Sequence, residues 1–230
     1  MIRVNEWFSP TIQGEGPHMG RRVGFVRFAN CNLACEWCDT PYSWDWTRFD
    51  RDAETMLLDV PTLADVVNGM GVRRVVLTGG EPMMQQRYMP PLAAATPGVL
   101  YDVETNGTIA PRPDTVEAVD LFMVSPKLAH SGDPEALRLK APALDAYASL
   151  ARDGRAAFKW VVKSQRDVLE AEALSEALGV PMDAVWMMPE GANRHDHMTR
   201  LIALADFIVG TGANLSTRLH VLAWSDKRGV

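Results

Sequence analysis

Short apolar segments rich in β-branched and aromatic residues recur along the chain, with helical patterns between them. Such segments predict β-strands. There are seven of them, at residues 22–28, 73–78, 98–104, 120–125, 156–163, 183–188 and 217–224. Strands that read as nearly continuous apolar runs and alternate with helices are typical of parallel sheets covered on both faces. The pattern therefore predicts an α/β fold, without deciding between an open sheet and a partial or closed barrel.

Two of the intervening stretches carry a helix start signal. Thr62 and Asp65 have the spacing of a capping box, as do Ser164 and Asp167. Apolar residues follow each start at helical spacing and are expected to face inward. They are Leu63, Val66, Val67 and Met70 in the first helix and Ala171, Leu174 and Leu178 in the second. The second helix is expected to end at Gly179.

Polar residues collect directly after five of the predicted strands. In parallel α/β folds the carboxyl ends of the strands meet at one edge, where functional residues gather. The five groups lie at residues 31–40, 79–82, 104–107, 125–127 and 189–190. The sequence thus predicts one site, built from all five groups.

Composition and charge restrict the kinds of partner. A chain of 230 residues that is 47% hydrophobic suits one domain, which we expect to span residues 1–230. A net charge of −6 argues against sequence-blind nucleic-acid binding, and no apolar stretch reaches the length of a membrane helix. We expect a soluble, cytoplasmic protein whose partner is a small molecule or another protein.

All three cysteines lie within residues 31–38, which suggests metal chemistry rather than disulfide bonds. Thiolates suit zinc or an iron–sulfur cluster. A zinc site would need a fourth ligand, and none of the five histidines has close knuckle-type spacing to the cysteines. A cluster held by three cysteines would leave one iron open, which is how a metal site becomes catalytic.

The cysteine spacing resembles that of radical S-adenosylmethionine enzymes. Cys31, Cys35 and Cys38 follow the pattern C-x₃-C-x₂-C, with the aromatic Trp37 before the last cysteine. The segment TGGEP at residues 78–82 resembles the glycine–glycine–glutamate motif of the same superfamily. The resemblance implies a [4Fe–4S] cluster whose open iron binds the methionine part of S-adenosylmethionine.

A narrower resemblance covers nearly the whole chain. The segment from EWFSPTIQGEG to CEWCDT, together with ETNGT, SPK, FKWVVK, MMPEG and RLHVLAW, resembles the 7-carboxy-7-deazaguanine synthase family. This resemblance implies a partial, open α/β barrel of the radical S-adenosylmethionine type, a homodimer and Mg²⁺ as a further cofactor. It implies conversion of 6-carboxy-5,6,7,8-tetrahydropterin to 7-carboxy-7-deazaguanine with loss of ammonia, in queuosine-type biosynthesis. It also implies an electron donor such as flavodoxin or ferredoxin.

Arg27 can be interpreted from the residues themselves. The alternation of a strand places Val23, Phe25 and Arg27 on one face, so the guanidinium shares a half-buried side with apolar residues. A buried guanidinium needs a partner. That partner is either a carboxylate of the protein or the carboxylate of a substrate, which arginine binds through two parallel hydrogen bonds.

The family resemblance assigns the remaining site residues. The cluster ligands are Cys31, Cys35 and Cys38, and the Mg²⁺ ligand is Thr40. The S-adenosylmethionine contacts are Trp37, Cys38, Asp39, Gly79, Gly80, Glu81, Ser125, Pro126 and Lys127, and Glu81 is expected to accept from an ammonium group. The substrate contacts are Ile12, Gln13, Gly14, Arg27 and Thr78. Further candidates are Glu104 and Asn106, for either ligand, and Met188, Pro189 and Glu190 of the MMPEG segment, on the adenine side of the cofactor. No side chain is expected to carry the reaction, since the cofactor delivers the radical.

One departure from the family pattern affects the adenine side, where members often have a glutamine in place of Met187 or Met188. Two alternatives from other classes stay open. A glycyl-radical activating enzyme would share the cluster and the GGEP segment but act on a protein backbone. A zinc-binding regulatory module would use the thiols without redox chemistry.

Overall fold

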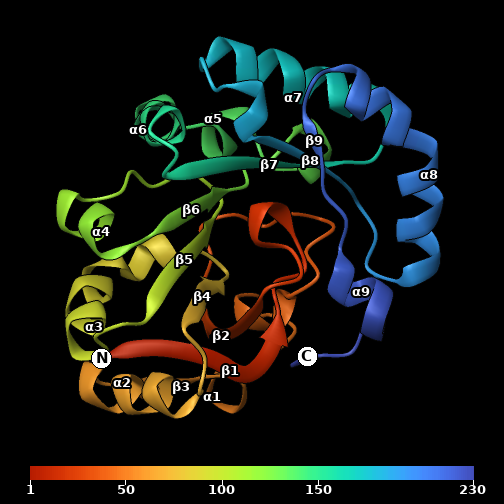
Figure 1. Cartoon of the computed structure of the whole chain (residues 1–230). Coiled ribbons are helices and arrows are strands. Elements are labelled where there is room, and N and C mark those ends of the chain that lie inside the picture. The colour runs from red at the N-terminus through yellow and green to blue at the C-terminus, as the bar shows by residue number, and fades with distance from the viewer.

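The computed structural model, which describes residues 1–230, is built around one curved sheet of nine strands (Figure 1). The strand order is β3–β1–β2–β4–β5–β6–β7–β8–β9. The strands are β1 (Ile2–Ile12), β2 (Arg22–Phe28), β3 (Met56–Leu58), β4 (Arg74–Gly79), β5 (Leu100–Thr105), β6 (Leu121–Val124), β7 (Ala156–Val162), β8 (Val185–Pro189) and β9 (Asn214–Leu215). Neighbours from β2 to β9 pair in parallel, and β1 is antiparallel to both β2 and β3. Because β3 and β9 do not pair, the sheet is a partial, open barrel, as expected.

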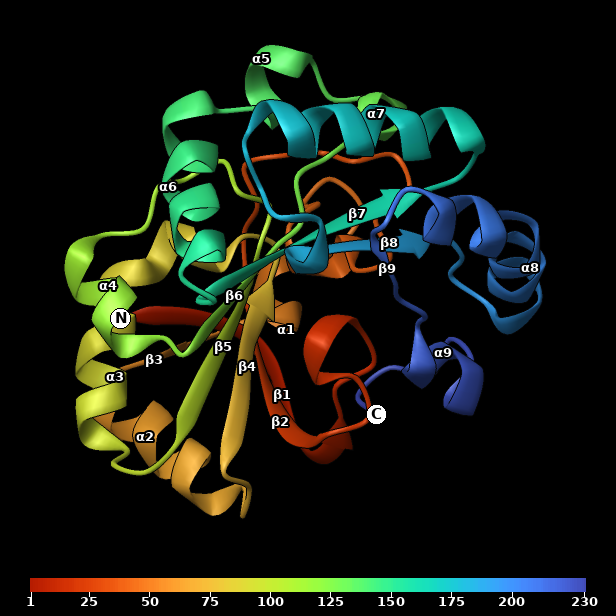
Figure 2. The same cartoon turned by 45° about the horizontal axis from the view of Figure 1, so that its top comes forward.

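The larger helices lie around the outer side of this barrel (Figures 1 and 2). The α-helices are α1 (Arg51–Glu54), α2 (Val60–Gly69), α3 (Met89–Ala95), α4 (Pro113–Ala118), α5 (Glu135–Arg138), α6 (Ala141–Arg152), α7 (Gln165–Ala177), α8 (Arg194–Gly210) and α9 (Leu219–Trp224). Short 3₁₀ helices are η1 (Gly16–His18), η2 (Pro41–Ser43), η3 (Pro82–Tyr88), η4 (Ala129–Ser131) and η5 (Met182–Ala184). None of the helices combines the length and the apolar character needed to cross a membrane.

Six of the seven predicted strands are confirmed, and the prediction for residues 217–224 is wrong. Those residues contain helix α9, because a short apolar run fits either a strand or a helix turn. The pattern also missed β1, β3 and β9. In β1 the polar Asn5, Glu6 and Ser9 and the proline at position 10 interrupt the apolar alternation, while β3 and β9 are too short to show one.

One of the two predicted helix starts is confirmed. Ser164 and Asp167 form a reciprocal capping box at the start of α7, and α7 ends next to Gly179, which has a positive φ. The start at Thr62 is wrong. The cap of α2 is Asp59, whose carboxylate accepts from the Thr62 backbone N–H at 2.9 Å. With Asp59 as the cap, the proline at position 61 falls in the first turn of the helix, where its missing N–H costs nothing.

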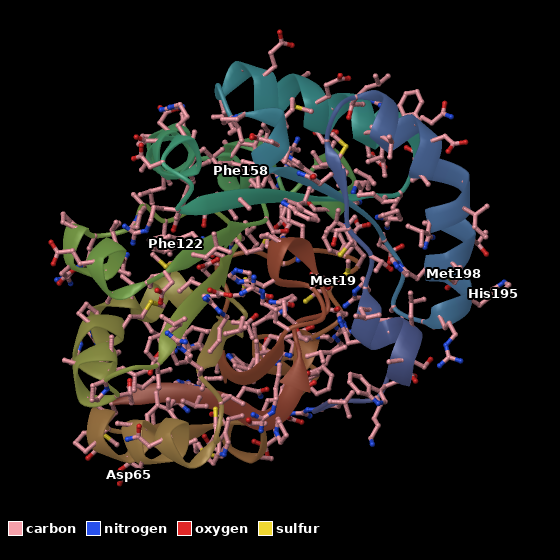
Figure 3. The ribbon with its side chains drawn as sticks, in the orientation of Figure 1. Met19, Asp65, Phe122, Phe158, His195 and Met198 are labelled. Carbon is pink, nitrogen blue, oxygen red and sulfur yellow. The ribbon has the colours of Figure 1, made fainter.

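The two faces of the sheet carry different side chains. On β7, Phe158 and Trp160 face the helices and are fully buried in the apolar core, whereas Lys159 lines the inner cavity. The same alternation on β6 places Phe122 against Tyr147 of α6, with ring centroids 5.5 Å apart. Figure 3 shows both phenylalanines on the helix-covered part of the sheet, with the exposed Asp65 and His195 at the periphery. The inner face is therefore not covered by helices, contrary to the sequence pattern.

The segment between β1 and β2, residues 13–21, lies on the inner side of the curved sheet (red in Figure 1). Its His18 Nδ1 lies 2.6 Å from Asp102 Oδ2 on β5, and Asp102 also pairs with Arg74 on β4. Gly16 has φ of +63°, and a Cβ there would overlap the side chain of Met123 on β6. Glycine thus allows this segment to lie against the strands, and we refer to residues 13–21 as the plug.

Candidate active site

A cavity of about 390 Å³ opens at the carboxyl edge of the parallel strands. Its walls include residues from all five polar groups that the sequence predicted at strand ends. Residues of the plug and the C-terminal residues 225–230 also line it. The predicted convergence of the five strand ends is confirmed, since all five meet at this one cavity.

All three cysteine side chains line this cavity. Trp44 Nε1 donates to Cys38 Sγ at 3.3 Å, and the Leu33 backbone N–H donates to Cys31 Sγ at 3.5 Å. Burial raises the pKa of Cys31 to about 11 and that of Cys35 to about 12, so the thiolate forms need a positive partner.

The thiols do not converge on one point, since no group of three or more His, Cys, Asp or Glu side chains could hold a single metal ion. In a [4Fe–4S] cluster each cysteine binds its own iron, so convergence is not required. The donor set, with N–H groups directed at the sulfurs, fits such a cluster.

The glycines of the TGGEP segment place the end of β4 against the cysteine loop. Gly79 has φ of +141°, and a Cβ there would overlap the backbone of Phe28. A Cβ on Gly80 would overlap the backbone of Asn30, the residue before the first cysteine. The Glu81 backbone N–H donates to the Asn30 carbonyl at 2.8 Å. Both glycines also line the cavity, so the same bare backbone holds the loop and faces the ligand space.

The Glu81 side chain does not reach the cavity. It is fully buried and accepts from Met83 N at 2.8 Å, Thr105 Oγ1 at 2.8 Å and Asn106 N at 2.6 Å. Burial raises its pKa. Glu81 therefore ties the ends of β4 and β5 together, and the expected contact with an ammonium group finds no support in this geometry.

Three other predicted contacts also lie outside the lining, namely Gly14, Pro126 and Pro189. The glycine at position 14 has a structural explanation, because a Cβ there would overlap the imidazole of His220 on α9. The glycine lets α9 pack on the start of the plug, and the Leu219 backbone N–H donates to the Gly14 carbonyl at 2.8 Å.

Three of the residues expected at S-adenosylmethionine contact one another in the cavity wall. Lys127 Nζ is 5.5 Å from the ring centroid of Trp37 and donates to Ser125 Oγ at 3.1 Å. Asp39 also faces the cavity. Burial alone would raise the pKa of Asp39, but the guanidinium of Arg218 outweighs it and the pKa is lowered. An ammonium group, a hydroxyl and a carboxylate are thus available to a zwitterionic ligand.

Residues expected at the substrate form a hydrogen-bonded row. Gln13 Nε2 donates to Glu104 Oε1 at 3.0 Å, and Thr78 Oγ1 donates to Glu104 Oε2 at 2.8 Å. Ile12 lines the cavity beside this row. The row offers both donors and acceptors, which suits the polar edge of a flat heterocycle.

Of the two interpretations made for Arg27, the structure shows the protein carboxylate and leaves the substrate carboxylate open. Its Nε donates to Glu6 Oε1 at 2.8 Å, so the protein supplies one carboxylate. Its two terminal nitrogens have no partner within the chain, and the side chain lines the cavity. The planar pair of Nη groups is free to bind a ligand carboxylate.

The remaining candidates also line the cavity: Thr40, Asn106, Met188 and Glu190. Thr40 Oγ1 lies 3.8 Å from Cys38 Sγ, close to where a cluster would bind. Asn106 Nδ2 donates to Asn32 Oδ1 at 3.0 Å, and Glu190 pairs with Arg200 at 2.6 Å.

The sequence patterns did not predict a buried network of ion pairs. Glu15 of the plug pairs with Lys159 of β7 and, at 3.1 Å, with Nε of Arg218 before α9. Burial would raise the pKa of Glu15, but the two cations outweigh it and lower the pKa well below its usual range. A lysine in the middle of a buried strand was the available signal, because such a charge needs a partner.

Comparisons with known proteins agree with this geometry. A family model described as a 4Fe-4S single cluster domain matches residues 12–107. The 7-carboxy-7-deazaguanine synthase of Pyrobaculum aerophilum is 37% identical, over 99% of this chain and 97% of that protein. The enzyme of the same name from Halobacterium salinarum is 35% identical, over 98% and 91%. The crystal structure of QueE from Escherichia coli matches with a TM-score of 0.66 and 25% identity, covering 95% of this chain and 94% of that one.

The open α/β barrel, with three cysteines in C-x₃-C-x₂-C spacing at its carboxyl edge, defines a radical S-adenosylmethionine enzyme. Within that class, the identity along nearly the full length places the chain in one family. It belongs to the 7-carboxy-7-deazaguanine synthases.

Proposed function

We propose that this chain converts 6-carboxy-5,6,7,8-tetrahydropterin to 7-carboxy-7-deazaguanine with loss of ammonia. The observation that carries the proposal is the shared cavity, in which the free guanidinium end of Arg27 and the Gln13–Thr78–Glu104 row face the same space as the three cysteines. Family membership favours this function over a glycyl-radical activating enzyme or a zinc-binding regulatory module.

Cys31, Cys35 and Cys38 would hold the [4Fe–4S] cluster, which when bound supplies the electron that cleaves S-adenosylmethionine. Lys127 and Ser125 are suited to the carboxylate and a hydroxyl of that cofactor, and Trp37 covers the ammonium group of Lys127. The bare backbone at Gly79 and Gly80 allows a close approach on the same side.

The substrate side supplies orientation. Arg27 would bind the pterin carboxylate through its two Nη groups, while Gln13, Thr78 and Glu104 contact the polar edge of the ring. These contacts fix which carbon faces the cofactor. Thr40 would give Mg²⁺ one hard oxygen ligand, with water and substrate filling the remaining positions. A homodimer, a flavodoxin or ferredoxin as electron donor, and a cytoplasmic location stay predictions.

The test is turnover by the anaerobically reconstituted, reduced protein with S-adenosylmethionine and Mg²⁺. We expect 7-carboxy-7-deazaguanine and ammonia from 6-carboxytetrahydropterin, and neither product from tetrahydropterin without the carboxylate. Mass spectrometry and an ammonia assay measure the outcome. If S-adenosylmethionine is cleaved while the carboxylated pterin stays intact, the proposed substrate is contradicted. The result would then favour the glycyl-radical activating enzyme.

A further inference from the structure

The last six residues of the chain return to the N-terminal strands at the rim of the cavity. Ser225, with φ of +61°, follows α9 and turns the backbone, and residues 225–230 then line the cavity. Figure 1 shows the C-terminus beside β1 and β2, far from it in sequence. Contacts of one side chain, Arg228, hold this segment there.

Arg228 binds the same carboxylate as Arg27. Its Nε donates to Glu6 Oε2 at 2.8 Å, while Arg27 Nε donates to Glu6 Oε1 at 2.8 Å. Arg228 also lies over the Tyr42 ring, 3.8 Å from its centroid, and Tyr42 Oη donates to Glu6 Oε1 at 3.1 Å. Both oxygens of the Glu6 carboxylate thus accept hydrogen bonds, and its orientation is fixed from β2, from η2 and from the C-terminal segment.

Glu6 itself does not line the cavity, although Arg27, Tyr42 and Arg228 do. Glu6 and Arg27 are directly opposite each other on the paired strands β1 and β2. Glu6 therefore lies behind Arg27 and holds its Nε, which directs the free Nη groups toward the ligand space.

The charges give Arg228 a second effect. Glu6 pairs with both Arg27 and Arg228, and Glu54 Oε2 accepts from Arg228 Nη2 at 3.0 Å on the exposed side. Two guanidinium groups and two carboxylates make this group neutral. Without Arg228 it would carry one net negative charge beside the Nη groups of Arg27, which would disfavour a ligand carboxylate.

We propose that Glu6 and Arg228 are positioning residues for Arg27, through which the C-terminal segment makes the cavity selective for a carboxylate-bearing substrate. Neither residue needs to touch the substrate. This inference rests on the proposed role of Arg27 in binding the pterin carboxylate.

The experiment compares the binding of 6-carboxypterin and of pterin, which differ by the carboxylate alone, to the reconstituted protein. In the wild type, 6-carboxypterin is expected to bind more tightly. Arg228→Met should reduce this preference about three- to five-fold, as for a half-exposed ion pair, without changing the affinity for S-adenosylmethionine. Arg228→Lys should restore part of the preference, since it keeps the charge but loses the planar fork.

Two controls keep the outcome specific. Arg87→Met removes an exposed arginine that also lies over a tyrosine ring, that of Tyr88 at 4.7 Å, but away from the cavity, and should leave the preference unchanged. In an Arg27→Met background, Arg228→Met should have no further effect on the preference, because its action passes through Arg27.

The outcomes separate the two proposals. A wild type without any preference for 6-carboxypterin would contradict the role of Arg27 in the proposed function. The positioning role alone would be overturned if the wild type shows the preference and the Arg228→Met protein keeps it in full. The variant must in that case have the iron content and the melting temperature of the wild type. The positioning role would also be overturned if Arg228→Met reduces the preference for 6-carboxypterin equally in the presence and in the absence of Arg27.

Discussion

The outer and inner faces of the same sheet bury their side chains in different ways. On the outer face Phe122, Phe158 and Trp160 are fully buried against helices. On the inner face Lys159 and Glu104 have charged or hydrogen-bonded partners and face the cavity. One strand, β7, contributes to both faces by alternation.

The difference shows which face carries stability and which carries chemistry. Burying a large apolar side chain contributes about 1.5–3 kcal/mol. Burying an ion pair costs desolvation that its attraction only partly offsets, so ion pairs are a poor source of stability. Charges on the inner face are therefore best explained by what they bind. Substitutions on the outer face should therefore change stability without changing ligand binding. On the inner face, removal of one partner of a buried ion pair should also cost stability, through the charge left without a partner, whereas substitution of a ligand contact should change binding.

The largest expected effect is at the cysteine loop on the cavity side. Cys31→Ser, Cys35→Ser or Cys38→Ser should abolish cluster binding, because each thiolate occupies its own iron. The apo-chain should stay folded, since the cysteines are only partly buried and lie outside the apolar core. Iron and sulfide assays after anaerobic reconstitution, with circular dichroism as the control, measure both. A triple variant that still cleaves S-adenosylmethionine would contradict the assignment.

On the outer face, Phe158→Ala should lower the free energy of unfolding by about 3–5 kcal/mol, through lost burial and the cavity that remains. The affinity of the folded protein for S-adenosylmethionine should not change. Urea unfolding and ligand titration check the two expectations. If Phe158→Ala weakens S-adenosylmethionine binding without lowering the free energy of unfolding, the outer face is not purely structural and the distinction between the two faces is wrong.

On the inner face, Glu15→Gln should lower the free energy of unfolding by about 3 kcal/mol at pH 7, because it leaves Lys159 and Arg218 without their shared carboxylate. The folded pKa of Glu15 is lowered, so its contribution is present above the unfolded value of about 4.3 and is lost as pH falls below it. The difference between wild type and variant should therefore narrow from pH 5 downward.

Urea midpoints at pH 7, 5 and 3.5 test this pH dependence. Glu176→Gln on α7 is the matched control, because Glu176 is exposed and forms no ion pair. A difference that stays constant across the three pH values would show that the effect of Glu15 is not electrostatic.

The smallest effect is expected at Arg27. Arg27→Lys keeps the positive charge but loses the planar fork, so binding of 6-carboxypterin should weaken by about 1–3 kcal/mol. The affinity for S-adenosylmethionine should stay nearly the same. Titration of both ligands decides between the interpretations, since equal losses would mean that Arg27 is structural.

Most of the fold could be predicted, because the parallel strands β2 and β4 to β8 have apolar runs bounded by polar ends. The antiparallel β1 could not, because Asn5, Glu6, Ser9 and the proline at position 10 interrupt its apolar alternation. Helix α9 was wrongly predicted as a strand because a short apolar run fits either element, and its contact with the plug is too distant in sequence to decide between them.

For the site, the cysteines and the strand-end groups were visible as local motifs. Glu15 and Glu6 have partners 203 and 222 positions away, at Arg218 and Arg228, and no spacing rule reveals them. Glu81 shows that a local motif can also mislead about the role of a side chain. Its motif is local, but its three donors use the whole carboxylate for structure.

The most direct test of the account follows the hydrogen atom that leaves the substrate. The reduced protein would be given S-adenosylmethionine, Mg²⁺ and 6-carboxytetrahydropterin carrying deuterium at position 6, and 5′-deoxyadenosine would be analysed by mass spectrometry. If the cavity holds the pterin carboxylate at Arg27 and its edge at Gln13, we expect deuterium in the 5′-deoxyadenosine. Unlabelled 5′-deoxyadenosine with intact pterin would contradict the account, because the hydrogen would then come from another molecule.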